Sequence, residues 1–109
     1  MQRIEYAPAA QSLVTSTSPA TITVRPDLTV MSLLSTLANV SGGNVTALTV
    51  ARTLDGTTYG PERSITSGIP LAAGASLDVD FIDEPALAYR FTITAASAGA
   101  VSLTSRGAV

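Results

Sequence analysis

Four acidic residues near the C-terminal third are the residues whose type and spacing could bind a metal. They are Asp78, Asp80, Asp83 and Glu84. Carboxylate oxygens at short spacing suit a hard cation such as Ca²⁺. However, Asp78 and Asp80 alternate with apolar residues, which is typical of the solvated face of a strand, and Asp83 and Glu84 precede a proline, as in a turn. We favour the strand and turn and assign no metal ligand. The cluster is also too local to flank a glycosidic bond in a cleft.

The residue types that dominate enzyme chemistry are missing from this chain. It contains no histidine, no cysteine and no lysine. This removes the common general base near neutral pH, the thiol nucleophile, the Schiff-base amine and every nitrogen or sulfur side chain that ligates transition metals. We therefore expect no enzymatic activity, no cofactor, no catalytic residue and no small-molecule substrate.

Two asparagines and one arginine are weaker candidates. Asn39-Val40-Ser41 and Asn44-Val45-Thr46 match the N-glycosylation pattern. Chance matches are expected in a chain so rich in serine and threonine, and we expect Asn44 to serve a turn. Arg90 lies in the middle of an aromatic strand, where we expect it to pair with acids at the rim of a subunit interface. Arg90→Ala is then expected to weaken assembly.

The bulk composition points to protein contacts. Hydrophobic residues make up 46% and charged residues 13% of the 109 residues, whereas about a quarter of an ordinary soluble domain is charged. Part of the surface is therefore expected to be covered by partner subunits. The net charge is −2 and the six arginines are scattered, which argues against nucleic acid. The most apolar run, 28–40, is shorter than the about twenty residues of a membrane span, and no signal peptide is visible at the N-terminus, so we expect synthesis in the cytoplasm.

Alternating residues predict strands over most of the chain. Leu77, Val79 and Phe81 share one face of one segment, and Val101 and Leu103 share a face of another. The longest inward set is Tyr89, Phe91, Ile93 and Ala95, opposed by Arg90, Thr92 and Thr94. Such strands, separated by Gly, Pro and Asp turns, indicate an all-β fold. We predict a single antiparallel β-sandwich, jelly-roll or Ig-like, with about seven or eight strands.

The remaining segments complete this prediction. Residues 1–19 are expected to form an extended N-terminal arm, with room for one edge strand, held by a neighbouring subunit; residues 20–109 form the sandwich. We interpret 28–40 as a strand buried on both faces rather than as a helix. Turns are expected at 42–44 and at Asp55-Gly56, around a strand over 45–53 that points Leu48 and Val50 inward.

Residues 49–59 read Thr-Val-Ala-Arg-Thr-Leu-Asp-Gly-Thr-Thr-Tyr. This segment is similar to a strand-and-turn motif of a known family, the small virion proteins of tailed bacteriophages, with Thr53 in place of the usual serine and Tyr59 in place of the commoner tryptophan. Residues 89–95 and 97–103 are similar to the paired strands that close those domains. The resemblance implies a capsid decoration (cement) protein, a head fibre, or a neck or tail component. It implies binding to the major capsid protein and to its own copies, as a dimer or trimer within the virion, and no catalytic residues.

The alternative is a carbohydrate-binding or adhesin module, because jelly rolls often bind sugars. Sugar sites depend on exposed aromatic platforms. The chain has no tryptophan, and since Tyr89 belongs to the inward set, Tyr6 and Tyr59 are the tyrosines expected to be free for this role.

Overall fold

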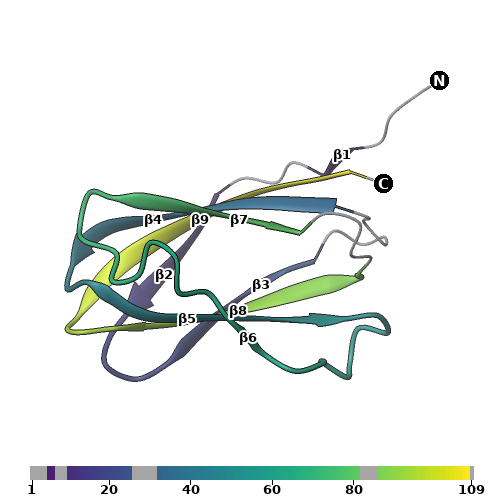
Figure 1. Cartoon of the computed structure of the whole chain (residues 1–109), viewed down its shortest axis with the longest axis horizontal. Coiled ribbons are helices and arrows are strands. Elements are labelled where there is room, and N and C mark those ends of the chain that lie inside the picture. Colours follow the sequence, from purple (N-terminus) through teal and green to yellow (C-terminus); the bar gives the residue numbers. More distant parts are fainter. Residues whose placement is uncertain (1–4, 7–9, 26–31, 82–85, 109) are drawn as a thin grey trace.

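Two antiparallel sheets pack face to face in the computed structural model (Figure 1), which describes residues 5–6, 10–25, 32–81 and 86–108. The first sheet has the order β1-β9-β4-β7, with β2 also paired to β9, and the second has the order β3-β8-β5-β6. The strands are β1 Glu5–Tyr6, β2 Gln11–Thr15, β3 Ala20–Val24, β4 Ser32–Gly42, β5 Val45–Thr53, β6 Arg63–Ser64, β7 Ser76–Phe81, β8 Ala88–Ala95 and β9 Gly99–Ala108.

The strand order is that of a jelly roll. Apart from the two-residue β1, eight strands are divided equally between the sheets, and from β2 to β9 consecutive strands lie in different sheets except for β5 and β6. In the Ig fold, by contrast, the first two strands share a sheet. The predicted all-β sandwich is therefore confirmed, and of its two variants the topology selects the jelly roll.

The core lies between the sheets and follows the predicted alternation. Tyr89 and Phe91 on β8 are fully buried, and the Phe81 ring of β7 stacks on Tyr89 with centroids 4.9 Å apart. This contact joins the two sheets. The other large buried side chains are Ile22, Val24, Leu33, Leu37, Val45, Leu48, Val50, Leu71, Val79, Ile93, Val101 and Leu103. The inward positions expected on β5, β7, β8 and β9 are thus confirmed.

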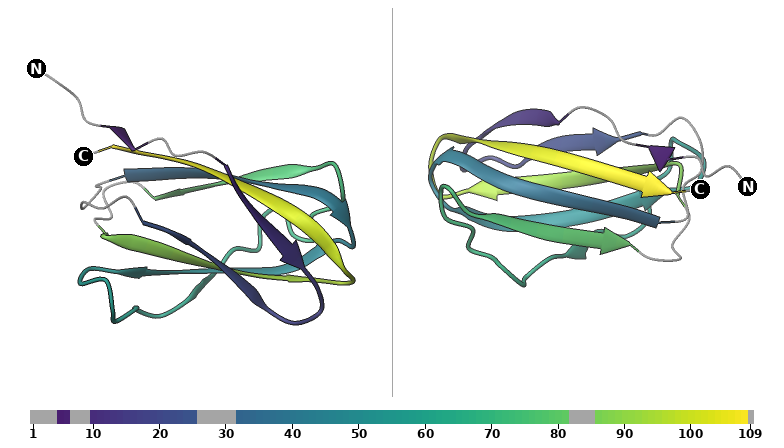
Figure 2. Two further views of the ribbon diagram at one scale, coloured as in Figure 1. Left: turned by 180° about the vertical axis from the view of Figure 1, so that it is seen from behind. Right: turned by 90° about the horizontal axis from the view of Figure 1, so that it is seen from above.

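β4 departs from its prediction in one respect. It is a strand, as expected, but one face alone is buried: Leu33 and Leu37 point into the core, whereas Leu34 is 48% and Val40 61% exposed. The expectation of burial on both faces is wrong, because no described segment covers the outer face of the first sheet (Figure 2). Residues 28–31 of the predicted strand lie outside the described residues.

Part of the expected N-terminal arm lies in the sandwich. β2 pairs with β9 over five positions, from Gln11 opposite Leu103 to Thr15 opposite Gly99, and β1 pairs with the far end of the same strand. Residues 11–15 are therefore held by the chain's own β9 rather than by a neighbouring subunit. Residues 1–4 and 7–9 of that arm lie outside the described residues.

Candidate functional site

The acidic cluster is only partly described. Asp78 and Asp80 are exposed on the outer face of β7, where the hydroxyl of Thr36 donates to Asp78 Oδ1 at 2.7 Å. This is the solvated strand face that the alternation predicted. Asp83 and Glu84 lie outside the described residues. Within the described part of the chain, no three acidic, histidine or cysteine residues come together in a way that could hold a metal ion.

Asp55 organises the turn after β5. Its Oδ1 accepts hydrogen bonds from the backbone N–H groups of Thr57 and Thr58, both at 2.8 Å, and from the hydroxyl of Thr53 at 2.9 Å. Gly56 follows with φ of 89°, a left-handed conformation that glycine adopts without strain, and a bridge from Thr53 to Tyr59 closes the turn. The turn predicted at Asp55-Gly56 is confirmed, and its carboxylate is occupied in holding the loop.

These bonds make the turn sensitive to acid. Hydrogen bonds from the N–H of Thr58, then from that of Thr57 and the Thr53 hydroxyl, hold the pKa of Asp55 well below its usual range. Its stabilising effect is thus complete above the unfolded-state value of about 4 and is lost as the pH falls through the lower folded value. We expect Asp55→Ala to have a lower Tm than wild type at neutral pH. In calorimetric scans below about pH 4, this difference in Tm should become smaller.

Thr58→Ala is the control for this prediction, because it alters the same turn but keeps the backbone N–H group that donates a hydrogen bond to Asp55. If the difference in Tm between Asp55→Ala and wild type stays constant from neutral to acid pH, the carboxylate does not hold the turn.

A second cluster forms where this loop folds back over the second sheet. The guanidinium of Arg90 lies 4.3 Å from the ring centroid of Tyr59, and its Nη2 is 3.8 Å from Glu62 Oε1. Thr92 also donates to that oxygen at 3.3 Å. Arg90 therefore has an acidic partner within its own chain, and one face of the Tyr59 ring is covered. Sequence reasoning missed this cluster, since nothing in the spacing shows how the loop returns.

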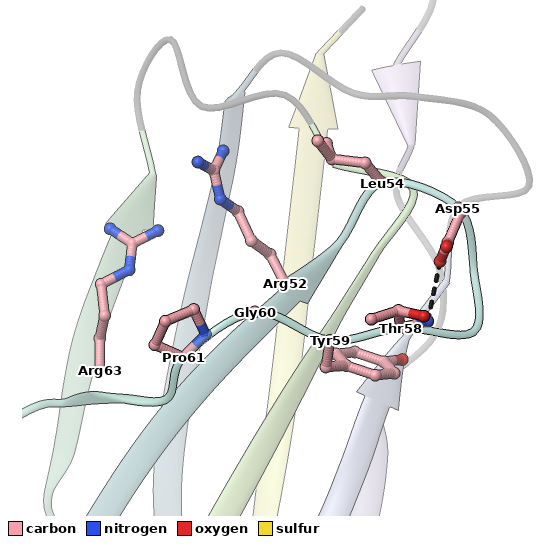
Figure 3. A pocket seen from close by; sticks show the side chains of 8 residues that line it. All are labelled: Arg52, Leu54, Asp55, Thr58, Tyr59, Gly60, Pro61 and Arg63. Atoms are coloured by element: carbon pink, nitrogen blue, oxygen red, sulfur yellow. Dashed lines mark hydrogen bonds between the residues drawn. The ribbon is translucent and has the colours of Figure 1, made fainter.

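The loop also lines an open pocket of about 530 Å³. Its lining comes from the end of β5 and the loop, and consists of Arg52, Leu54, Asp55, Thr58, Tyr59, Gly60, Pro61 and Arg63. Figure 3 shows Arg52 and Arg63 projecting to one side of the loop and the Tyr59 ring to the other. The Arg63 guanidinium lies 5.2 Å from the Phe81 ring centroid. The pocket offers two arginines, the Asp55 carboxylate that holds the turn, and an apolar wall.

The first of the two N-glycosylation patterns is inaccessible. Asn39 is 1% exposed, and its Nδ2 donates to the carbonyls of Gly43 and Leu71 at 3.1 and 2.9 Å. Asn44 is exposed in the turn where it was expected, and its carbonyl accepts from the N–H of Ala96 at 2.8 Å. Both asparagines thus form hydrogen bonds that connect neighbouring turns.

Among the residues that the structure describes, none at one end of the sandwich is charged. Four stretches of sequence lack Asp, Glu, Lys and Arg entirely, namely 11–24, 32–51, 64–77 and 91–105. The turns within them meet, since Ala96 bonds to Asn44, Ala95 to Ser16, and Val45 to Leu71. We call these turns and the adjoining strand halves the uncharged end. It lies at the left of Figure 1, opposite the end where β1 pairs with β9. The charged side chains that the structure describes are Arg25, Arg52, Asp55, Glu62, Arg63, Asp78, Asp80, Arg90 and Arg106.

Comparisons with known proteins identify the fold but no family. No protein-family model matches the sequence, and no curated protein sequence is significantly similar to it. A chitosan-binding module from a chitosanase/glucanase of Paenibacillus sp. IK-5 superposes with a TM-score of 0.60 at 15% identity, over 90% of this chain and 75% of the module. Chains of infectious bursal disease virus, strains Gx and Gt, give TM-scores of 0.53 and 0.51 at 14% identity, over 98% of this chain. The chain spans about a third of the viral chains, 31% and 32%. At these identities the similarity shows the β-sandwich fold alone.

Proposed function

We propose that this chain is a non-enzymatic structural protein of a tailed-phage virion, a decoration protein that binds the major capsid protein shell and its own copies. The observation that carries the proposal is the uncharged end. Charged side chains normally keep small proteins apart in solution, and they are depleted at the centres of protein interfaces. A sandwich end formed by serine, threonine, alanine, glycine and valine is therefore suited to burial against other subunits.

Two further observations support this proposal. The jelly-roll fold is shared with chains of a virus particle, and the resemblance to phage virion proteins covers β5, the Asp55 turn, β8 and β9. A decoration protein acts by adding buried area across the joints between subunits, at about 25 cal/mol per Å² of apolar surface before the costs of association. Many copies of a weak contact can therefore raise the stability of a shell. Synthesis in the host cytoplasm and incorporation into the particle complete the proposal.

Deletion of the coding sequence tests the proposed role. We expect particles without this chain to assemble and to release their genome at a lower temperature or lower pressure than complete particles, because the buried area at the joints is lost. Adding the purified chain back should restore the resistance. Equal resistance of complete and deleted particles, or absence of the chain from purified particles, would contradict the role. If an electron-microscopy map places the chain at the neck or tail, the chain has the same structural function at another site of the virion.

The pocket beside Tyr59 supports a second candidate function, carbohydrate binding. Tyr59, Leu54 and Pro61 provide apolar lining, and a carbohydrate-binding module shares the fold. Against it, Arg90 covers one face of the tyrosine ring, and two arginines line the pocket, which disfavours a cationic polymer such as chitosan. A glycan array with the purified chain distinguishes the candidates: a glycan signal that is lost in Tyr59→Ala would favour this function over the virion role.

A further inference from the structure

We infer that the outer face of the first sheet, where it reaches the uncharged end, binds a second copy of this chain. The inference deepens the proposed function, on which it rests, by naming one partner of the uncharged end and the surface that this partner occupies. The residues at its centre are Val14 on β2, Val40 on β4 and Ala100 on β9. We call these three the valine patch.

The valine patch is built by the register of three neighbouring strands. Val14 lies opposite Ala100, and Ala100 lies opposite Ser41. The pairing of β4 with β9 shifts between Asn39 and Ser41, so that the bulged strand carries Val40 outward at this point. Val14 is 77% and Val40 61% exposed, and they are two of the four large hydrophobic residues exposed in the described part of the chain. Two exposed valines therefore flank one alanine on a single sheet face.

The surface next to the patch on these three strands is uncharged and formed by small side chains. The outward residues beside it are Ser12, Ala38, Ser41 and Ser102. None of them is larger than serine. Two sheets with such small outward side chains can approach to the spacing of about 10 Å that is typical of packed sheets. The face is therefore shaped to meet another sheet.

Charge decides between the possible partners. A surface without charges offers no counter-ion to a charged partner, whose burial would cost the hydration of each unpaired charge. The same face of a second copy avoids this cost. In a two-fold contact each patch meets its own equivalent, because residue i then contacts j while j contacts i. The charged residues of both copies, including Arg106, Asp78 and Asp80, would lie outside the centre of the contact.

The edge of the same sheet is a poorer place for two copies to meet. β7 is one of the two edges of this sheet, and antiparallel pairing of two β7 strands around Val79 would place Asp78 of one copy beside Asp80 of the other. Like charges directly opposite each other are destabilising, and charges on an edge strand commonly prevent pairing. The copies are therefore expected to associate through the sheet face rather than through β7.

Analytical ultracentrifugation of the full chain over a concentration series tests this inference. We expect wild type to form a dimer, and Val14→Asp and Val40→Asp each to weaken dimerisation at least tenfold, because each would place an unpaired charge in the contact. Leu54→Asp is the matched control: Leu54 is 68% exposed but lies in the Asp55 loop, so its dimer constant should equal that of wild type. Val14→Thr keeps the size and the strand preference, and a weaker dimer with an unchanged melting curve would exclude misfolding as the cause.

The outcomes separate this inference from the proposed function. A monomeric wild type, or equal effects of Val14→Asp and Leu54→Asp, would overturn self-association through the valine patch. If such a monomer still cosediments with shells, the virion role stands without self-association through the valine patch. If wild type dimerises as expected but neither binds shells nor occurs in particles, the virion role fails and the self-association surface stands. A dimer that survives Val14→Asp while shell binding is lost would assign the patch to the shell and overturn the inference.

Discussion

Replacing Gly42 by alanine is expected to lower the free energy of unfolding by about 2–5 kcal/mol, the sum of a left-handed backbone penalty and overpacking. Gly42 has φ of +88° and lies opposite Gly99 where β4 meets β9. A Cβ at Gly42 would lie 2.2 Å from the carbonyl oxygen of Ala98 and 2.4 Å from Gly99 Cα. Main-chain atoms cannot move aside as a flexible side chain can. Urea unfolding followed by circular dichroism measures the effect.

Gly74→Ala is the matched control for this substitution. Gly74 has a similar φ of +84°, but a Cβ there would meet nothing within 4 Å. We expect it to lose about 1–2 kcal/mol, which is the backbone penalty alone. Equal losses at Gly42 and Gly74 would show that the strands do not approach as closely as described. Both glycines lie at the uncharged end, Gly42 as the last residue of β4 and Gly74 in the loop before β7, so the comparison also tests how tightly that surface is packed.

Replacing Phe91 by alanine is expected to lower the free energy of unfolding by about 3–5 kcal/mol. Phe91 is fully buried on β8, between Ile22 of β3 and Val50 of β5. The substitution removes the ring from the centre of the core and leaves a cavity that the surrounding strands cannot fill. Leu54→Ala, at a side chain 68% exposed, should change stability by no more than about 0.5 kcal/mol. A loss below about 1 kcal/mol at Phe91, in the same urea titration, would contradict the described core.

Local alternation was enough to predict most strands. Leu77, Val79 and Phe81, and the set that includes Tyr89 and Phe91, alternate strictly because one face of each strand is buried and the other is solvated. The face of β4 could not be predicted in this way. Whether Leu34 and Val40 are covered depends on which segments lie over the sheet, and no pattern within 28–40 contains that information.

Long-range pairing also explains why the sequence does not show where Gln11–Thr15 pairs. Gln11–Thr15 has a weak apolar pattern and follows a proline-containing segment, yet it pairs with β9, which is at the other end of the chain. Its inward residues, Leu13 and Thr15, are positioned by the pairing with β9. A strand whose partner is so distant gives little local signal.

Some features of the candidate site could be predicted from the sequence, and others depend on long-range contacts. The absence of histidine, cysteine and lysine limits the chemistry from the sequence alone. The Arg90–Tyr59–Glu62 contact depends on how the Asp55 loop folds back, and could not be foreseen. The four charge-free stretches were visible in the sequence, but their meaning required the fold. In this jelly roll the turns after β2, β4 and β8 lie at one end, and the loop before β7 joins them, so separate neutral stretches form one surface.

Hydrogen–deuterium exchange of the chain, free in solution and within its native particle, tests most directly whether the uncharged end is the contact surface. We predict slower exchange in the particle for the turns at 16–19, 41–44, 67–75 and 96–98 and for the strand halves beside them. The Asp55 loop, 54–62, should exchange equally in both states. Slower exchange confined to 54–62, with the uncharged end unchanged, would place the contact at the charged end and contradict the account.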